Sequence, residues 1–359
     1  MMKKTNITTI ILLLLLVAGS WFAYTLVSED ELADRPFSDF RIEDTSAVTR
    51  LVLTDTEGGT IAITRRNSEK RWMIEGTSLQ ARPESANLIL ETFFRLAVKE
   101  DVPKAAQSNV LSLLSVKHRK VEVYNNDEKK PFKTYYVGQA TADHFGSYML
   151  LQKGNKKSNV PYIVHKQGTY AYLDSRFFTD TTEWRFTGVY TYRPKDIKRV
   201  TIKNYEAPSL SYSVDVYEDG NVGLFNDLGQ PVVGFDSASV KRYLSYYSNL
   251  HIESFNTVFP QFILDSIKGT TPAYEITVET RSGEKNPTRL FRVRGKDVVI
   301  DINGDTVKWD RERALIQLKS GDMAVVQYFS WGDAIRPPKY FMPFKNKHLM
   351  PEPETKRGY

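Results

Sequence analysis

The residues best spaced for metal binding lie near the C-terminal end, in the stretch DINGDTVKWDRE. Oxygen-bearing side chains stand at its first, third, fifth and twelfth positions, as in a calcium-binding loop: Asp301, Asn303, Asp305 and Glu312. The glycine that such a loop requires at its sixth position is replaced by Thr306. An Asn-Gly pair also stands between VVIDI and DTVKW, and Asn-Gly favours the tight turn of a β-hairpin. We therefore expect a hairpin here, with a calcium site as the weaker alternative.

Acid–base chemistry would need a histidine within hydrogen-bond reach of a partner. The best candidate is His144 in KTYYVGQATADHFGSYMLL, where it follows Asp143 and lies between Gly138 and Gly146. Adjacent residues of an extended chain point to opposite sides, so Asp143 cannot orient the ring of His144. We expect this stretch to connect two strands. A hydrolase that uses Asp143, His144 or His165 is therefore the least favoured hypothesis.

Other common chemistries have no signature in the chain. It has no cysteine, which excludes disulfides, zinc–thiolate sites and thiol nucleophiles. It has no nucleophile elbow, phosphate-binding glycine loop, dinucleotide fingerprint or paired-histidine metal helix. We therefore expect a protein that is not an enzyme and that has no cofactor.

The positive charge lies mainly at the two ends of the chain. The formal net charge is +6, of which Lys3 and Lys4 carry two units and the residues from Arg336 onward carry a further excess. The body between these ends is about neutral, whereas a nucleic-acid-binding domain gathers its basic residues on a folded surface. We therefore expect no nucleic-acid partner.

Aromatic side chains are the remaining candidates for ligand contacts. The chain has 20 tyrosines and 19 phenylalanines. Several are neighbours, namely Phe177-Phe178, Tyr190 with Tyr192, and Tyr246-Tyr247. Aromatic residues in strands mostly form core and cross-strand pairs, so we expect core or partner interface here. A platform for stacking sugars is the alternative.

The first structural element expected along the chain is an apolar N-terminal segment. Residues 7–27 carry no charge and are long enough as a helix to cross a bilayer. Lys3 and Lys4 precede the segment and acidic residues follow it, which predicts a cytoplasmic N-terminus at residues 1–6. We expect a retained single-pass anchor in the inner membrane, then a linker at 28–40, with the bulk of the chain in the periplasm. A signal peptide cleaved near Ala18-Gly19-Ser20 is the alternative.

The rest of the chain reads as two similar halves. AVTRLVLTD matches DIKRVTIKN about 150 residues later, and both alternate as half-buried strands do. An amphipathic helix follows each, in PESANLILETFFRL and in DSASVKRYLSYYSNL, and further strands come after it. We predict an α+β fold with two tandem, duplicated units at 41–187 and 188–335. Each unit has an antiparallel-rich sheet and one main helix, and a loosely held Pro/Lys-rich tail follows at 336–359.

Several stretches of the first half, in order, resemble an uncharacterised bacterial family. They are RWMIEG, ARPESANLILETFFRLAVKEDVPKAA, KTYYVGQATADHFGSYMLL, PYIVHKQGTYAYLDSRFF and EWRF. The chain resembles the domain-of-unknown-function family numbered 4340, in its Bacteroidota form. The positions that carry the resemblance include Trp72, Gly138, Asp143, Gly146, Tyr148, Pro161, Arg176, Phe177, Trp184 and Arg185. The resemblance implies a membrane-anchored extracytoplasmic domain associated with gliding-type ABC transporter components, and it implies no catalytic residues.

These observations favour a non-enzymatic accessory or scaffold protein. We expect it to dock with an ABC-type permease or an envelope complex, and exposed strand edges such as TRLFRVRG are candidate contacts. A module that binds periplasmic glycan or peptidoglycan is the alternative hypothesis.

Overall fold

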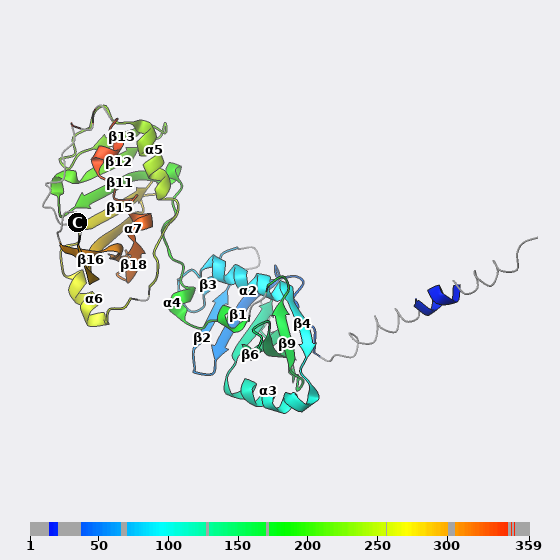
Figure 1. The fold of residues 1–359 in the computed structure, drawn as a ribbon. Helices are drawn as coiled ribbons and strands as arrows, with labels where there is room; N and C mark the ends of the chain where they lie inside the picture. Colours follow the sequence, from blue (N-terminus) through cyan, green and yellow to red (C-terminus); the bar gives the residue numbers. More distant parts are fainter. Residues whose placement is uncertain are drawn as a thin grey trace, which may run out of the picture. The chain divides into compact units, whose positions relative to one another are not determined.

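The chain forms two compact units, unit 1 ending at Arg185 and unit 2 beginning at Phe186 (Figure 1). The structure is a computed structural model that describes residues 14–20, 37–65, 70–126, 129–169, 172–255, 257–300, 306–343, 346 and 348. Of the N-terminal segment, residues 14–20 are helical. None of the described helices combines the length and the apolar character needed to cross a membrane. Most of the predicted anchor at 7–27 lies outside the described residues.

Unit 1 is built on an antiparallel sheet whose strand order is β3-β2-β1-β5-β6-β7-β9-β4, with β8 paired to β7. The strands are β1 (Val48–Asp55), β2 (Thr60–Thr64), β3 (Met73–Ile74), β4 (Leu96–Asp101), β5 (Arg119–Asn125), β6 (Lys133–Ala140), β7 (Ser147–Lys153), β8 (Lys156–Lys157) and β9 (Tyr162–Lys166). Sequence neighbours pair as hairpins, and β4 closes one edge by pairing with β9.

Two longer helices of unit 1 cover the two faces of this sheet (Figure 1). α2 (Pro83–Arg95) begins with a proline in its first turn and buries Ile89 and Phe93 in the main core. α3 (Lys104–Val116) buries Val110 and Leu114 in a second cluster. Alternate residues of β7 serve the two layers, since Met149 and Leu151 lie in the main core and Leu150 lies under α3. The unit ends with η1 (Asp174–Arg176) and α4 (Thr181–Trp184).

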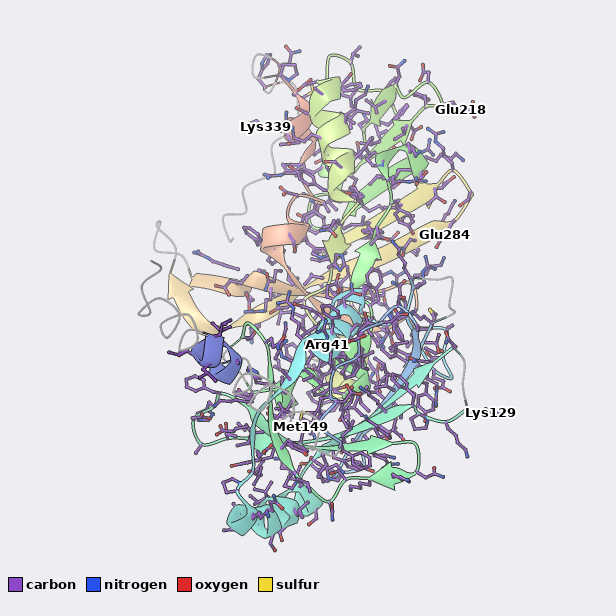
Figure 2. All side chains as sticks on the ribbon, turned by 90° about the vertical axis from the view of Figure 1, so that its right-hand side faces the viewer. Arg41, Lys129, Met149, Glu218, Glu284 and Lys339 are labelled. Carbon is purple, nitrogen blue, oxygen red and sulfur yellow. The ribbon has the colours of Figure 1, made fainter. Side chains whose placement is uncertain are left out.

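Unit 2 has an antiparallel sheet of strand order β13-β12-β11-β15-β16-β17-β18 and a separate pair, β10-β14. The strands are β10 (Gly188–Tyr190), β11 (Ile197–Asn204), β12 (Tyr212–Val216), β13 (Val222–Phe225), β14 (Leu250–His251), β15 (Tyr274–Thr280), β16 (Lys285–Ile300), β17 (Thr306–Gln317) and β18 (Met323–Gln327). In Figure 2 the exposed Glu218 and Glu284 lie at hairpin ends of this unit, whereas the labelled Met149 is completely buried in unit 1.

The helices of unit 2 repeat the arrangement of unit 1. α5 (Ser237–Tyr246) is capped by Asp236, whose side chain accepts the backbone N–H of Ala238, and it packs on the main core. α6 (Gln261–Lys268) places Leu264 on the other face of the sheet, against Leu315 of β17. The remaining short helices are η2 (Pro194–Asp196), η3 (Pro208–Leu210), α7 (Tyr328–Trp331) and η4 (Pro338–Phe341).

The structure confirms the predicted fold class but differs from the prediction in the number of helices and in the tail. The mixed α+β class and the antiparallel sheets are confirmed, and the predicted strands and helices correspond to β1, β11, α2 and α5. The expectation of one main helix in each unit is wrong, because α3 and α6 form a second helical layer. The loose tail was predicted from Arg336, yet Phe341 is fully buried and its carbonyl accepts the backbone N–H of Asp236. The first part of that segment therefore belongs to the core of unit 2.

The two strands around the Asn-Gly pair form the expected hairpin. β16 pairs antiparallel with β17 up to Ile300 and Thr306, so the connection consists of residues 301–305. That connection lies outside the described residues, and with it Asp301, Asn303 and Asp305. Glu312, the fourth candidate calcium ligand, is exposed on β17 and pairs with Arg313 at 3.3 Å. Within the described residues there is no group of carboxylates or histidines suited to a metal ion.

Candidate functional site

A mainly apolar concavity lies in unit 2, and we call it the unit 2 groove. It has a volume of about 510 Å³. Its apolar surface comes from the sheet and from the segment that precedes α6: Val258, Phe259, Val293, Leu315 and Val325. Its charged residues are Glu253, Arg294, Asp310 and Arg313. A concave, mainly apolar surface with a few polar groups is typical of a binding site.

The long β16–β17 hairpin builds one side of the groove. β15 stops pairing with β16 at Leu290, and β16 continues for ten residues beyond that point with β17. A bulge then interrupts β17, where residues 310–313 lie opposite Val293 alone. Asp310 stabilises the bulge, since its carboxylate accepts the backbone N–H groups of Glu312 at 2.8 Å and Arg313 at 2.9 Å. The bulge thus places Asp310 and Arg313 beside the apolar residues.

The opposite side of the groove is held by an ion pair. Arg313 donates to both carboxylate oxygens of Glu253, with the shortest contacts from Nε to Oε2 at 2.8 Å and from Nη2 to Oε1 at 3.0 Å. The hydrogen bond from Arg313 lowers the pKa of Glu253. The backbone of the same segment pairs with β18, because Glu253 N–H donates to the Val325 carbonyl at 2.7 Å. Arg294 is exposed and makes no ion pair within the described part of the chain.

Unit 1 has a hollow of a different character, at the start of α2. It is larger, about 850 Å³, and is lined by polar residues with Pro83: Arg65, Lys70, Arg71, Gln80 and Asn87. Arg65 already has structural partners, because its Nε donates to the Val48 carbonyl at 2.8 Å and its Nη2 to the Thr45 carbonyl at 2.9 Å. Its guanidinium also lies 4.7 Å from the ring centroid of Trp72. The basic character of this hollow thus comes partly from a side chain engaged in structure.

The candidate catalytic stretch is a turn between β6 and β7, as expected. Asp143 there accepts the Thr141 hydroxyl, the backbone N–H of Phe145 at 3.0 Å and the Lys99 ammonium at 2.8 Å. The bond from Lys99 is the first cause of a strongly lowered pKa for Asp143, which is therefore held as a carboxylate. His144 has a left-handed backbone with φ of 60°, and its exposed ring lies 6.2 Å from that of Tyr172. Asp143 thus braces the turn instead of orienting His144.

His165 lies on β9, opposite Ala97 of β4. Burial, and secondarily the charge of Lys99, lower the pKa of His165. Its ring has no hydrogen bond to a described residue. The arrangement therefore offers no base–nucleophile pair around either histidine in the part of the chain that the structure describes.

Most positions that carry the family resemblance are packing residues. Trp72, Phe177 and Trp184 are at most 1% exposed, and Pro161 is also buried. The Trp184 indole donates to the Phe178 carbonyl at 2.9 Å, and Arg185 forms an isolated bridge with Ala81. Tyr148 packs beside the cluster under α3, and Arg176 belongs to η1.

The two glycines of the turn allow close approach of neighbouring elements. A Cβ at Gly138 would lie 2.5 Å from Cδ2 of Leu114 in α3, and one at Gly146 would lie 2.8 Å from Cγ2 of Ile163. These glycines therefore serve packing, as do the large aromatic residues. The stretch that looked most like an active site secures α3 and β9 to the sheet.

The neighbouring aromatic residues are also mainly core. Phe177, Tyr190 and Tyr247 are fully buried, and Phe178, Tyr192 and Tyr246 are partly buried. The hydroxyls of Tyr212, Tyr243 and Tyr247 form a buried network that ends on the Ala334 carbonyl. Burial raises the pKa of each of these three tyrosines. These side chains offer no open row of rings for stacking on sugars.

The groove residues were missed by the sequence reasoning, which treated TRLFRVRG as an exposed strand edge. Its first three residues, Thr288 to Leu290, pair with β15, and Arg289 and Leu290 also pair with β17, so this part is internal to the sheet. Only Val293 to Gly295 at its end reach the groove. The signal that could have pointed to the groove was the unusual length of the two strand-like runs on either side of Asn303-Gly304.

Comparison with known proteins gives this chain no relative. No family model matches it, and neither a curated protein nor a solved structure is significantly similar to it. The resemblance drawn from the sequence motifs stays a prediction.

Proposed function

We propose that this protein is a non-enzymatic accessory or scaffold protein of the bacterial inner membrane, which docks with an ABC-type transporter or an envelope assembly. The observation that carries the proposal is the unit 2 groove, an open apolar surface whose bulge is stabilised and whose main ion pair is internal. Such a surface suits a macromolecular contact better than catalysis, because three of its four charged side chains, Glu253, Asp310 and Arg313, are already engaged within the protein.

We propose that residues 7–27 are a single-pass anchor, with the N-terminus in the cytoplasm and both units in the periplasm. The side chains of Leu14, Leu15, Leu16 and Val17 are between 59% and 67% exposed, as expected for a helix that faces lipid. The lysines before the segment favour this orientation. Anchoring would hold both units close to the outer surface of a membrane partner.

We also propose that the two units arose by duplication. Counterpart strands stand in the same order, since β2-β1-β5-β6-β7-β9 in unit 1 corresponds to β12-β11-β15-β16-β17-β18 in unit 2. Each unit also has a short helix whose last residue is a fully buried tryptophan, Trp184 in α4 and Trp331 in α7. The indole of each tryptophan donates a hydrogen bond to a backbone carbonyl. Two copies of one fold would give a scaffold two surfaces that can diverge.

A pull-down tests the scaffold function. The tagged full-length chain and a variant that lacks residues 1–27 are each isolated in mild detergent, and the proteins recovered with them are identified by mass spectrometry. We expect a transporter or envelope component with the anchored chain and a much weaker recovery without the anchor. Recovery of cell-wall fragments alone would contradict the proposal and favour glycan binding.

A further inference from the structure

The unit 2 groove continues the layer formed by α6. Val293, Leu315 and Val325 of the groove also belong to, or pack against, the cluster that Leu264 of α6 covers. The groove and α6 therefore share one face of the sheet, and the groove lies beside the place where Leu264 packs on it. Val293, Arg294 and Gly295 of the groove lie on β16 beyond Leu290, the last residue of β16 that pairs with β15.

Helices cover the other sheet faces of this chain. In unit 1, α3 is the counterpart of α6. It packs Ala106, Val110 and Leu114, which are spaced four residues apart, on the strands. α3 has 13 residues and α6 has 8, which leaves α6 about 7 Å shorter at the usual helical rise. The face with the longer hairpin thus has the shorter helix. A second helix beside α6 would complete the layer at the usual spacing of packed helices.

The charges of the groove further define its occupant. Glu253 and Arg313 neutralise each other, and Asp310 is engaged with backbone N–H groups of the bulge. Arg294 is the lining cation that no described carboxylate pairs with. An occupant with an apolar stripe and an acidic residue at its margin would complement these groups.

We propose that the unit 2 groove binds an amphipathic helix of the partner protein, which lies beside α6 with an acidic side chain directed to Arg294. The proposal rests on the scaffold function and names the surface that performs it. Val258 is 77% exposed at the groove, and Phe262 of α6 is 70% exposed. Helices that bind in grooves use apolar anchors at three- and four-residue spacing, which these side chains can contact.

Photocrosslinking from the groove tests this inference. The full-length chain carries p-benzoylphenylalanine in place of Val258, or in place of Val233 as the matched control, which is 87% exposed in the connection between β13 and α5. The chain is irradiated in cells, and the crosslinked peptides are sequenced. We expect position 258 alone to capture one segment of another protein, with apolar residues at helical spacing and an acidic residue beside them.

A charge reversal provides the second measurement. Arg294→Glu should lower the crosslinking from position 258 about tenfold, because it puts like charges together, and Arg294→Lys should retain most of it. Circular dichroism of each variant verifies folding, which is expected since Arg294 is exposed and makes no ion pair with a described residue.

Four results would overturn the groove proposal: a crosslink to a second copy of this chain, a crosslink to lipid, a captured segment without helical periodicity, or no crosslink. If the pull-down still recovers a partner with Val258→Asp/Arg294→Glu, the groove is wrong and the scaffold function stands. If the unmodified anchored chain recovers no partner, the proposed function itself fails.

Discussion

Unit 1 and unit 2 have six counterpart strands in the same order, but they differ in the lengths of one hairpin and one helix. They also differ in one pairing, since β4 joins the main sheet through β9 whereas β14 pairs with β10. In unit 1, β6 and β7 have 8 and 7 residues, and α3 above them has 13. In unit 2, β16 and β17 have 16 and 12 residues, and α6 has only 8. The longer hairpin extends the sheet while the shorter helix covers less of it. The comparison teaches that the lengths of a hairpin and of the helix packed on it can change while the order of the counterpart strands stays the same.

The largest expected effect tests whether the two units unfold independently of each other. Trp184→Ala and Trp331→Ala each remove a fully buried indole and its hydrogen bond, which should destabilise the unit concerned by about 3–5 kcal/mol. Differential scanning calorimetry of the full chain should show that each variant lowers one transition and leaves the other unchanged. Leu228→Ala, at a side chain that is 75% exposed, is the control. A joint shift of both transitions would show that the two units unfold together.

A smaller effect is expected from the contact that seats α3 in unit 1. In Gly138→Ala the new Cβ would lie 2.5 Å from Cδ2 of Leu114 and 3.0 Å from the Tyr148 carbonyl oxygen, so the Leu114 side chain or α3 must shift. We expect a loss of about 1–3 kcal/mol from the unfolding free energy of unit 1, measured by chemical denaturation. The matched variant in unit 2 is Gly269→Ala at the end of α6, where the nearest atom is at 3.4 Å. That variant should change stability by less than about 0.5 kcal/mol, and an equal effect at both sites would contradict the packing role of Gly138.

The smallest effect concerns acid stability. The pKa of Asp143 in unit 1 is lowered from its ordinary value of 3.8, first by the hydrogen bond from Lys99. A lowered folded-state pKa stabilises the fold above the unfolded pKa, and this stabilisation is lost as the pH falls through the folded-state pKa. We therefore expect Asp143→Asn to lower the melting temperature of unit 1 slightly at neutral pH and to flatten its decline below pH 4.

The control for that experiment lies in unit 2. The pKa of Asp219 is also lowered, first by the backbone N–H of Asn221 in the turn between β12 and β13. Asp219→Asn should flatten the acid decline of the unit 2 transition and leave that of unit 1 intact. A change of the unit 1 profile in Asp219→Asn would mean that the acid response does not report on these local turns.

Local patterns predicted much of the secondary structure and little of the candidate site. Alternation in the runs that begin at Val48 and Ile197 identified β1 and β11, and Pro83 and Asp236 marked the starts of α2 and α5. α3 was not recognised, because it buries only Val110 and Leu114, while other apolar side chains such as Leu113 and Val116 are exposed and blur its apolar face. The packing of α3 on the sheet is seen only in the structure, where Leu114 of the helix lies against Gly138 of β6.

The sequence by itself determined the element types, the mixed α+β class and the likeness of the two halves, because these depend on local periodicity and on turn and cap residues. The tertiary structure decided which faces are covered and which stay open. The partner of Arg313 is Glu253, sixty residues away, and the floor of the groove joins three strands with the segment before α6. Such contacts depend on strand register and on the relative lengths of packed elements, which no local pattern specifies.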